Sequence, residues 1–145
     1  LCNFDINDYK REGIEKIGVC FNLDKHTQGG SHWVSMFIDL KEKYIFYFDS
    51  TGHNMPKEIS VLVERISSQG LFKKYVNKLE HQRGNSECGM YTLMFLITML
   101  SNKWYNGRSK KHVQFKNSRE KIGFFRDKRI SDYRVAKFRD IYFNE

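Results

Sequence analysis

One cysteine stands where a nucleophile would be most useful, at the point where a polar loop leads into an apolar helix. The loop from His81 to Glu87 is polar, and the run from Met90 to Leu100 is largely apolar. Cys88 lies between them, and we expect it at the N-terminus of a buried central helix. Such an end carries unpaired N–H groups and about half a positive charge, which stabilise a thiolate. Cys88 is therefore a candidate nucleophile, and Gly89 after it leaves room for a substrate. The simpler alternative is a small buried residue that begins a core helix.

A thiol nucleophile needs a base, and the base needs a group that orients it. His32 comes just before an expected strand, and Asp49 comes just after the next one. A two-residue turn at Leu40-Lys41 would set these strands in a register that places His32 opposite Asp49. Their Cβ atoms would then be about 5 Å apart. This geometry predicts a carboxylate that fixes the imidazole tautomer and leaves the other ring nitrogen facing a thiol.

Two further side chains suit the same chemistry. Gln82 precedes Cys88 on the same loop, and its amide could donate to an oxyanion together with the Cys88 backbone N–H. Considered alone, a glutamine at position 82 would more often be a surface residue. Trp33 follows His32 and, considered alone, fits a core position as well as a functional one.

The elements that position these residues follow from hydrophobic spacing and from turn residues. We expect strands over residues 17–23, 33–40, 44–48 and 75–80, with the third strand central because it is apolar on both faces. We expect helices ending near Gly13, between Pro56 and Gly70, from Cys88 through Leu100, and over 130–143 with Ser131 as its cap. Residues 103–129 are predicted to be irregular. The fold class is α+β, a small mixed sheet flanked by helices.

Composition limits the possible classes of protein. The 145 residues suit a single domain spanning residues 1–145, and the chain begins at Leu1 without methionine, which is typical of a fragment or processed piece. No apolar run is long enough to span a membrane. Three cysteines without a CxxC pair predict no disulfide framework, metal site or cofactor, and fit a reducing, intracellular compartment. Cys20 is expected in the core, Asp39 in a turn, and His26, His53, His81 and His112 in loops or on the surface.

The charge is concentrated near the C-terminus. Residues 103–139 hold 13 Lys or Arg against three Asp or Glu, a net +10, whereas the whole chain carries +8. The remaining residues therefore sum to −2. This basic third predicts either an ordinary solvated surface or a polyanionic partner such as DNA.

Four side chains and two neighbours occur in the order and spacing of one known family: His32-Trp33, Asp49, Gln82 and Cys88-Gly89. The set resembles the clan CE cysteine proteases, which include the SUMO-specific (ubiquitin-like-specific) proteases and adenain. The resemblance covers about residues 17–100 and implies a papain-like or adenain-like core without a cofactor. Residues 85–91 and the closing segment 138–143 are closer to the proteases of large DNA viruses, which process capsid polyproteins.

The resemblance implies a role for each residue. Cys88 would be the nucleophile, His32 the general base, Asp49 its orienting partner and Gln82 the oxyanion donor. Trp33 would help to form a narrow channel over a Gly-Gly substrate tail. SUMO-specific enzymes usually carry a tryptophan-containing segment upstream of the histidine, and the 31 residues before His32 contain no tryptophan. The chain is then either truncated at its N-terminus or from a branch with a different entrance.

These observations predict a cysteine endopeptidase that cleaves after Gly-Gly or similar small-residue sites in a viral polyprotein, in the host cytoplasm or the virion. The first alternative is a nuclear or cytoplasmic deconjugase for SUMO, NEDD8 or ubiquitin. The second is an acetyltransferase of related architecture, which would depend on coenzyme A and an inositol phosphate. A nucleic-acid-binding module that retains only the fold is a further alternative, which the intact residue set argues against.

Overall fold

The computed structural model describes residues 3–24, 32–106 and 111–143. Its elements in chain order are α1 (Ile6–Arg11), β1 (Lys16–Asn22), β2 (Trp33–Asp39), β3 (Tyr44–Phe48), α2 (Lys57–Ser67), β4 (Lys73–Val76), α3 (Cys88–Ser101), β5 (Lys103–Asn106), β6 (Lys111–Gln114), α4 (Ser118–Arg126) and α5 (Asp132–Phe143). Four strands form a sheet in the order β1-β2-β3-β4, in which only β3 and β4 pair in parallel. The predicted α+β class with a small mixed sheet is confirmed.

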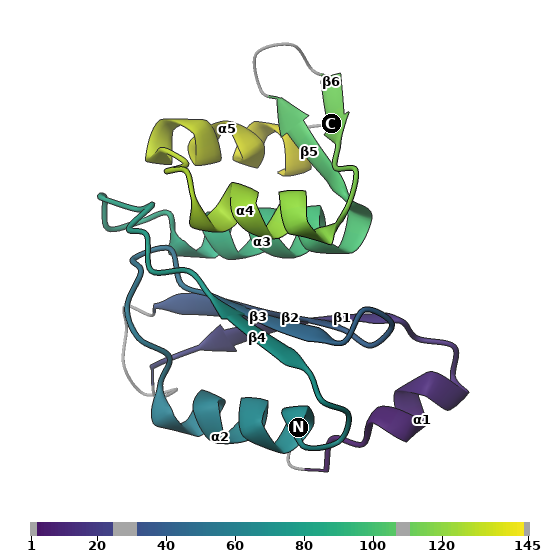
Figure 1. Ribbon diagram of the computed structural model, residues 1–145. Coiled ribbons are helices and arrows are strands. Elements are labelled where there is room, and N and C mark those ends of the chain that lie inside the picture. The colour runs from purple at the N-terminus through teal and green to yellow at the C-terminus, as the bar shows by residue number, and fades with distance from the viewer. Residues whose placement is uncertain (1–2, 25–31, 107–110, 144–145) are drawn as a thin grey trace.

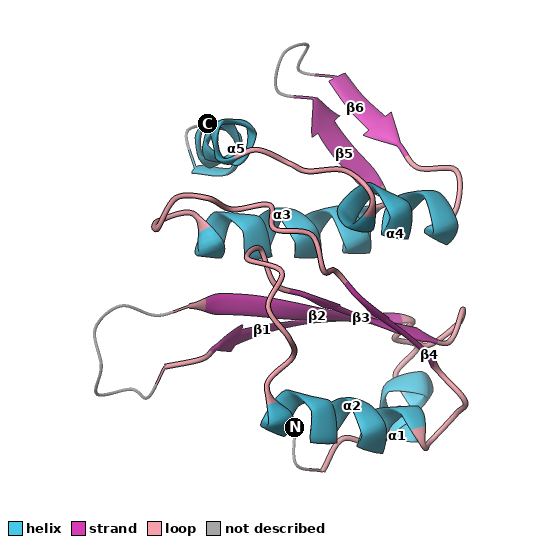
Figure 2. Cartoon of the chain, turned by 60° about the vertical axis from the view of Figure 1, so that its left-hand side comes forward, coloured by secondary structure: helices cyan, strands magenta, loops and turns pink. Residues whose placement is uncertain are grey.

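The sheet lies between two layers (Figure 1). Helices α3 and α4 cover one face, with α5 and the β5–β6 hairpin on the side of α3 away from the sheet, and α1 and α2 cover the other face, as Figure 2 shows from a second side. Alternate side chains of β3 fill the two cores, so that Phe48 stacks on Phe95 of α3 with ring centroids 4.7 Å apart, while Ile45 packs in the same cluster as Val63 of α2. Every residue of β3 is buried, which confirms its predicted central place.

The central helix begins at the predicted residue. Cys88 is the first residue of α3, and the helix ends at Ser101 before Asn102, which adopts a left-handed conformation with φ 57°. At that end the buried Lys121 donates from Nζ to the Met99 carbonyl at 2.9 Å, which satisfies one of the last carbonyls of α3. Burial lowers the pKa of Lys121 to about 8. The helix is therefore fixed in the core at the end opposite Cys88.

The predicted hairpin register is wrong by two residues. Asp39 pairs with Tyr44 and Ser35 with Phe48, so the β2–β3 connection holds four residues, 40–43, instead of two. The longer turn forms because the Asp39 carboxylate accepts hydrogen bonds from the backbone N–H groups of Lys41 and Glu42, at 3.0 and 2.8 Å. Asp39, expected in the turn, is instead the last residue of β2, and only its side chain reaches the turn.

Two further predictions about the elements are corrected. Strand β4 covers residues 73–76 and not 75–80. The segment 103–129, predicted to be irregular, contains β5, β6 and α4. The many charged residues of this segment made its helix hard to recognise. In α4 the Asn117 side chain caps the helix by accepting from the Glu120 N–H, and Ile122 and Phe125 are buried on one face.

Candidate active site

His32 and Asp49 are in direct contact. The ring Nε2 of His32 lies 2.8 Å from Oδ1 of Asp49. The same oxygen accepts hydrogen bonds from the backbone N–H and the hydroxyl of Thr51, at 2.8 and 2.7 Å. Burial opposes ionisation of Asp49, but the hydrogen bonds from His32 and Thr51 outweigh it and lower the pKa of the carboxyl group. Asp49 is therefore a buried carboxylate aimed at the histidine ring.

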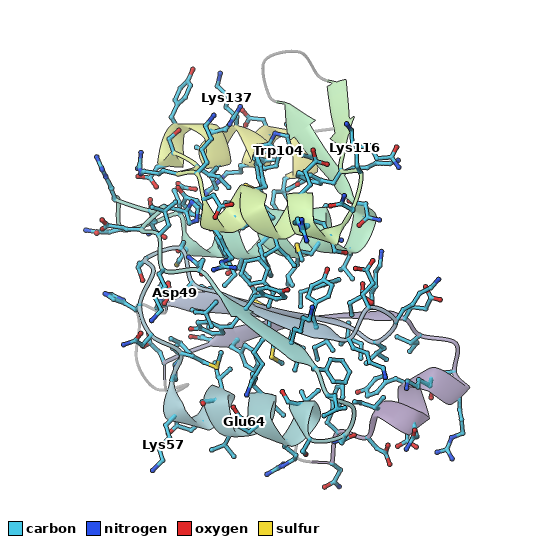
Figure 3. The ribbon with its side chains drawn as sticks, in the orientation of Figure 1. Asp49, Lys57, Glu64, Trp104, Lys116 and Lys137 are labelled. Atoms are coloured by element: carbon cyan, nitrogen blue, oxygen red, sulfur yellow. The ribbon has the colours of Figure 1, made fainter. Side chains whose placement is uncertain are left out.

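The backbone of Asp49 is held by a second buried side chain, Asn77. The Asn77 Oδ1 accepts from the Asp49 N–H at 2.9 Å, and its Nδ2 donates to the Asp49 carbonyl at 2.6 Å. This pair joins the end of β3 to the segment that follows β4 and leads to the cysteine. Sequence reasoning missed Asn77, whose one signal was a polar residue within an expected strand. Figure 3 labels Asp49, at the end of the sheet beside the start of α3.

Cys88 completes the contact on the other side of the imidazole. Its thiol is a hydrogen-bond partner of the His32 side chain, and Cys88 is itself buried. Since Nε2 bonds to Asp49, the remaining ring nitrogen, Nδ1, is the one left for sulfur. Hydrogen bonding to Asp49 raises the pKa of His32 against the effect of partial burial, and the Asp49 charge and the Cys88 contact act in the same direction. His32 therefore lies between a carboxylate that orients it and the side chain of Cys88.

Gln82 is buried and tightly oriented. Its Oε1 accepts from the Ser50 hydroxyl at 2.8 Å, its Nε2 donates to the Gly84 carbonyl at 2.7 Å, and its backbone N–H donates to the Ser50 carbonyl at 2.8 Å. An amide nitrogen has two hydrogens. Within the described ranges Gly84 is the one acceptor for Nε2, which leaves a hydrogen for a bound group.

A mostly apolar cavity of about 680 Å³ lies beside Cys88. It is lined by Cys20, Trp33, Ser86, Gly89, Met90, Thr92, Leu93, Arg139 and Phe143. Trp33 is 37 % exposed, so it is a wall of this cavity and not a core residue. A Cβ added to Gly89 would lie 3.9 Å from the indole, which is ordinary contact. The Gly89 position therefore borders both the thiol and the cavity.

Two sequence-based expectations, about residues outside the predicted active site, are wrong. Cys20 is exposed at the cavity and not in the core, because alternate residues of the edge strand β1 remain accessible. His81 is fully buried, with Nε2 donating to the Phe125 carbonyl at 2.8 Å and Nδ1 accepting from the Ile130 N–H at 3.0 Å. Burial lowers the pKa of His81, which keeps the ring neutral. The position of His26 lies outside the described residues.

Neither a metal site nor a membrane-spanning helix is found in the described part of the chain. No group of three or more His, Cys, Asp or Glu residues there could hold a metal ion. No helix there is long and apolar enough to cross a bilayer.

The sequence matches the model of one family of proteases. The Ulp1 protease family, C-terminal catalytic domain, matches residues 14–123. The chain therefore belongs to the Ulp1 protease family, in agreement with the resemblance to clan CE seen in the sequence.

Viral proteins are among its relatives. R355 of Acanthamoeba polyphaga mimivirus, which is named as a thiol protease, is 36% identical over 110 residues, which cover 71% of this chain and 36% of that protein. S273R of African swine fever virus, named SUMO-1 cysteine protease, is 33% identical over 96 residues, covering 61% of this chain and 35% of that protein. These similarities agree with the viral branch indicated by the sequence.

A solved structure shows the same fold. The crystal structure of the African swine fever virus pS273R protease superposes with a TM-score of 0.70 at 28% identity, and covers 91% of this chain and 45% of that one. The chain thus spans about a third of the length of the curated relatives it matches and under half of the solved protease.

Proposed function

We propose that this chain is a cysteine endopeptidase. The observation that supports the proposal best is the hydrogen-bonded series from Asp49 through His32 to Cys88, with the cysteine as first residue of α3. In this proposal His32 is the base, Asp49 orients it, and residues 1–145 form the catalytic domain. The nucleophile must remain a free thiol, which fits a reducing compartment.

The reaction follows from the order of these contacts. His32 takes the proton of the Cys88 thiol, the sulfur attacks the scissile carbonyl carbon, and the carbonyl oxygen becomes an oxyanion. The second amide hydrogen of Gln82 and the backbone N–H of Cys88 stabilise that charge. His32 then gives a proton to the leaving amine, which departs as the C–N bond breaks and leaves a thioester on Cys88. Water, activated by His32, attacks the thioester and releases the acid.

The proposed substrate is an extended segment with glycine before the scissile bond. Glycine has no Cβ, so a Gly-Gly segment can lie flat against the wall formed by Trp33 and Gly89. One added methyl there would cost about 1.4–3 kcal/mol, or about tenfold to 160-fold in kcat/KM. A viral polyprotein is the substrate we favour, because the relatives are viral. Deconjugation of a ubiquitin-like protein is the second candidate, because S273R carries the name SUMO-1 cysteine protease.

The test compares substrates and probes on the same preparation. Gly-Gly-x and Gly-Ala-x peptides should differ at least about tenfold in kcat/KM, and Trp33→Ala should reduce that difference. Equal cleavage of both peptides by the wild-type chain would refute the glycine preference. A SUMO or ubiquitin vinyl-sulfone probe separates the two candidates, since labelling of Cys88 without peptide cleavage would favour the deconjugase.

We also propose that the basic third contacts a polyanion such as DNA. The sequence count overstates the available charge, because Lys121 is buried while Arg129 and Arg139 form ion pairs with Asp132 and Glu87. Several cations remain exposed on this side of the sheet: Lys103, Lys116, Arg119, Arg126, Lys128 and Arg134. Lys116 and Lys137 lie in the layer opposite Lys57 (Figure 3).

A further inference from the structure

The loop that carries Gln82 is attached, on both sides of Gln82, to the segment that runs from the end of α4 to the start of α5. On one side, His81 donates to the Phe125 carbonyl and accepts from the Ile130 N–H. On the other side, the carboxylate of Asp132 accepts from the backbone N–H groups of Arg83 and Gly84, each at 3.1 Å from Oδ2. Gln82 is thus held between two anchors that belong to the C-terminal part of the chain.

Asp132 also reaches the helix that carries the thiol. Its Oδ1 lies 2.9 Å from the hydroxyl of Tyr91, three residues after Cys88. Tyr91 is fully buried, and its hydroxyl lies 2.7 Å from the Ile130 carbonyl. One carboxylate therefore links the loop of Gln82 to the first turn of α3.

The path from Asp132 to the Gln82 amide is short. Asp132 binds the Gly84 N–H, and the Gly84 carbonyl in turn accepts from Gln82 Nε2. Partial burial opposes ionisation of Asp132, but the hydrogen bonds from Tyr91, Arg83 and Gly84 outweigh it and lower the pKa of the carboxyl group. The anchor is consequently charged and strengthens each hydrogen bond that it accepts.

We infer that Asp132 is a positioning residue of the active site, which acts through Gln82 by fixing the backbone at Arg83 and Gly84. Asp132 lies outside the segment 14–123 that matches the protease family, so the family match does not assign it. The inference rests on the proposed function, in which Gln82 donates to the oxyanion. A displacement of a donor by about 1 Å can lower a rate by about 100-fold.

A purely structural role makes a different prediction. Asp132 stands in the first turn of α5, where a carboxylate stabilises the helix by interacting with its N-terminal N–H groups. If that were its whole effect, replacing it would lower the thermal stability without a specific loss of kcat. The two roles therefore separate when kcat, KM and stability are measured on the same variants.

The test is a double-mutant cycle on a Gly-Gly-x peptide with Asp132→Asn, Gln82→Ala and their combination. Asp132→Asn should lower kcat about tenfold to 100-fold with KM nearly unchanged. The rate of Cys88 alkylation by iodoacetamide should stay unchanged, because the substitution leaves the contact between His32 and Cys88 in place. In the Gln82→Ala background the same substitution should change kcat by less than about twofold. Asp127→Asn, which removes an exposed carboxylate at the end of α4, is the matched control and should be silent.

Each other outcome identifies what fails. If Gln82→Ala lowers kcat and Asp132→Asn does not, the inference about Asp132 is wrong and the proposed function stands. If Asp132→Asn costs as much in the Gln82→Ala background as in the wild type, the residue does not act through Gln82. If the loss of kcat only follows the unfolded fraction, Asp132 is a structural cap. Full kcat in Gln82→Ala overturns the oxyanion role of Gln82 and the inference with it, whereas absence of cleavage by the wild-type chain overturns the proposed function itself.

Discussion

Asp49 contacts His32 just beyond the end of the β2–β3 pair, because His32 precedes the first residue of β2 and Asp49 follows the last residue of β3. The paired residues end at Ser35 and Phe48, so the two are not the cross-strand pair that a two-residue turn would give. Their side chains nevertheless meet, with His32 Nε2 2.8 Å from Asp49 Oδ1. Thr51, in the turn after Asp49, adds two hydrogen bonds to the same carboxylate oxygen.

This contact predicts a large effect of removing the Asp49 charge. Asp49→Asn should lower kcat about 100-fold to 10⁴-fold, because the amide neither stabilises an imidazolium nor selects the correct tautomer. The pKa of His32 should fall, and titration of the ring by NMR would show it. The control is Asp39→Asn, a buried carboxylate at the other end of the hairpin, which should alter stability alone. Activity close to wild type in Asp49→Asn would show that the contact has no catalytic role.

The hairpin shows how far sequence reasoning reaches. Aromatic and β-branched residues at strand spacing predicted β2 and β3 and the side to which His32 and Asp49 point. Register depends on the turn, and the Asp39 carboxylate lengthened that turn by binding two backbone N–H groups. A slip of two residues preserves the face, whereas a slip of one would have separated the pair.

The long-range anchors could not be predicted. The side chain of Asn77 bonds to a residue 28 positions away, and that of Asp132 to the loop 48 and 49 positions away. Neither residue belongs to a periodic pattern, and each is selected by tertiary packing. Cys88 and Gln82 could be predicted from the sequence because both belong to one local segment. The burial of His81 could not be predicted, because it results from the packing of α4.

Gly52 should be more sensitive to substitution than Gly13. Both have positive φ, 73° and 74°, so alanine at either position costs about 1 kcal/mol in backbone strain. A Cβ on Gly52 would lie 2.8 Å from the Lys78 carbonyl oxygen, whereas one on Gly13 meets nothing within 4 Å. Gly52→Ala should therefore lose about 1–3 kcal/mol more in the free energy of unfolding. Equal losses in urea melts of the two variants would contradict the close approach at Gly52.

His81 should make the protein less stable in weak acid. Its folded pKa is below the ordinary value of 6.5, so the unfolded state binds more protons as pH falls. The free energy of unfolding should fall as pH drops below 6.5 and level off beneath the folded pKa. His32 has a raised pKa and acts in the opposite sense, with its contribution lost as pH rises through its folded pKa, above 6.5. His81→Gln should flatten the slope below pH 6.5, and an unchanged slope would refute this account.

The affinity for DNA should fall as salt is added, and it should depend on the cations of the basic third and not on those of α2. Each lost phosphate contact reduces the slope of log affinity against log salt by about 0.9. Lys116→Gln should reduce the slope by about that amount, because Lys116 belongs to the basic third and lies in the layer opposite α2. Lys57→Gln, on α2 in the opposite layer, should leave it unchanged. Equal slopes for both variants, or no binding at about 50 mM salt, would leave the basic third as a solvated surface.

The most direct test of the proposed protease is the detection of its covalent intermediate. The chain should be mixed with a Gly-Gly ester or a Gly-Gly-x peptide, quenched in acid during turnover, digested and analysed by mass spectrometry. We predict an acyl group on the sulfur of Cys88, none on Cys20, and loss of both adduct and turnover in Cys88→Ala. An adduct on another residue, or continued cleavage by Cys88→Ala, would contradict the account.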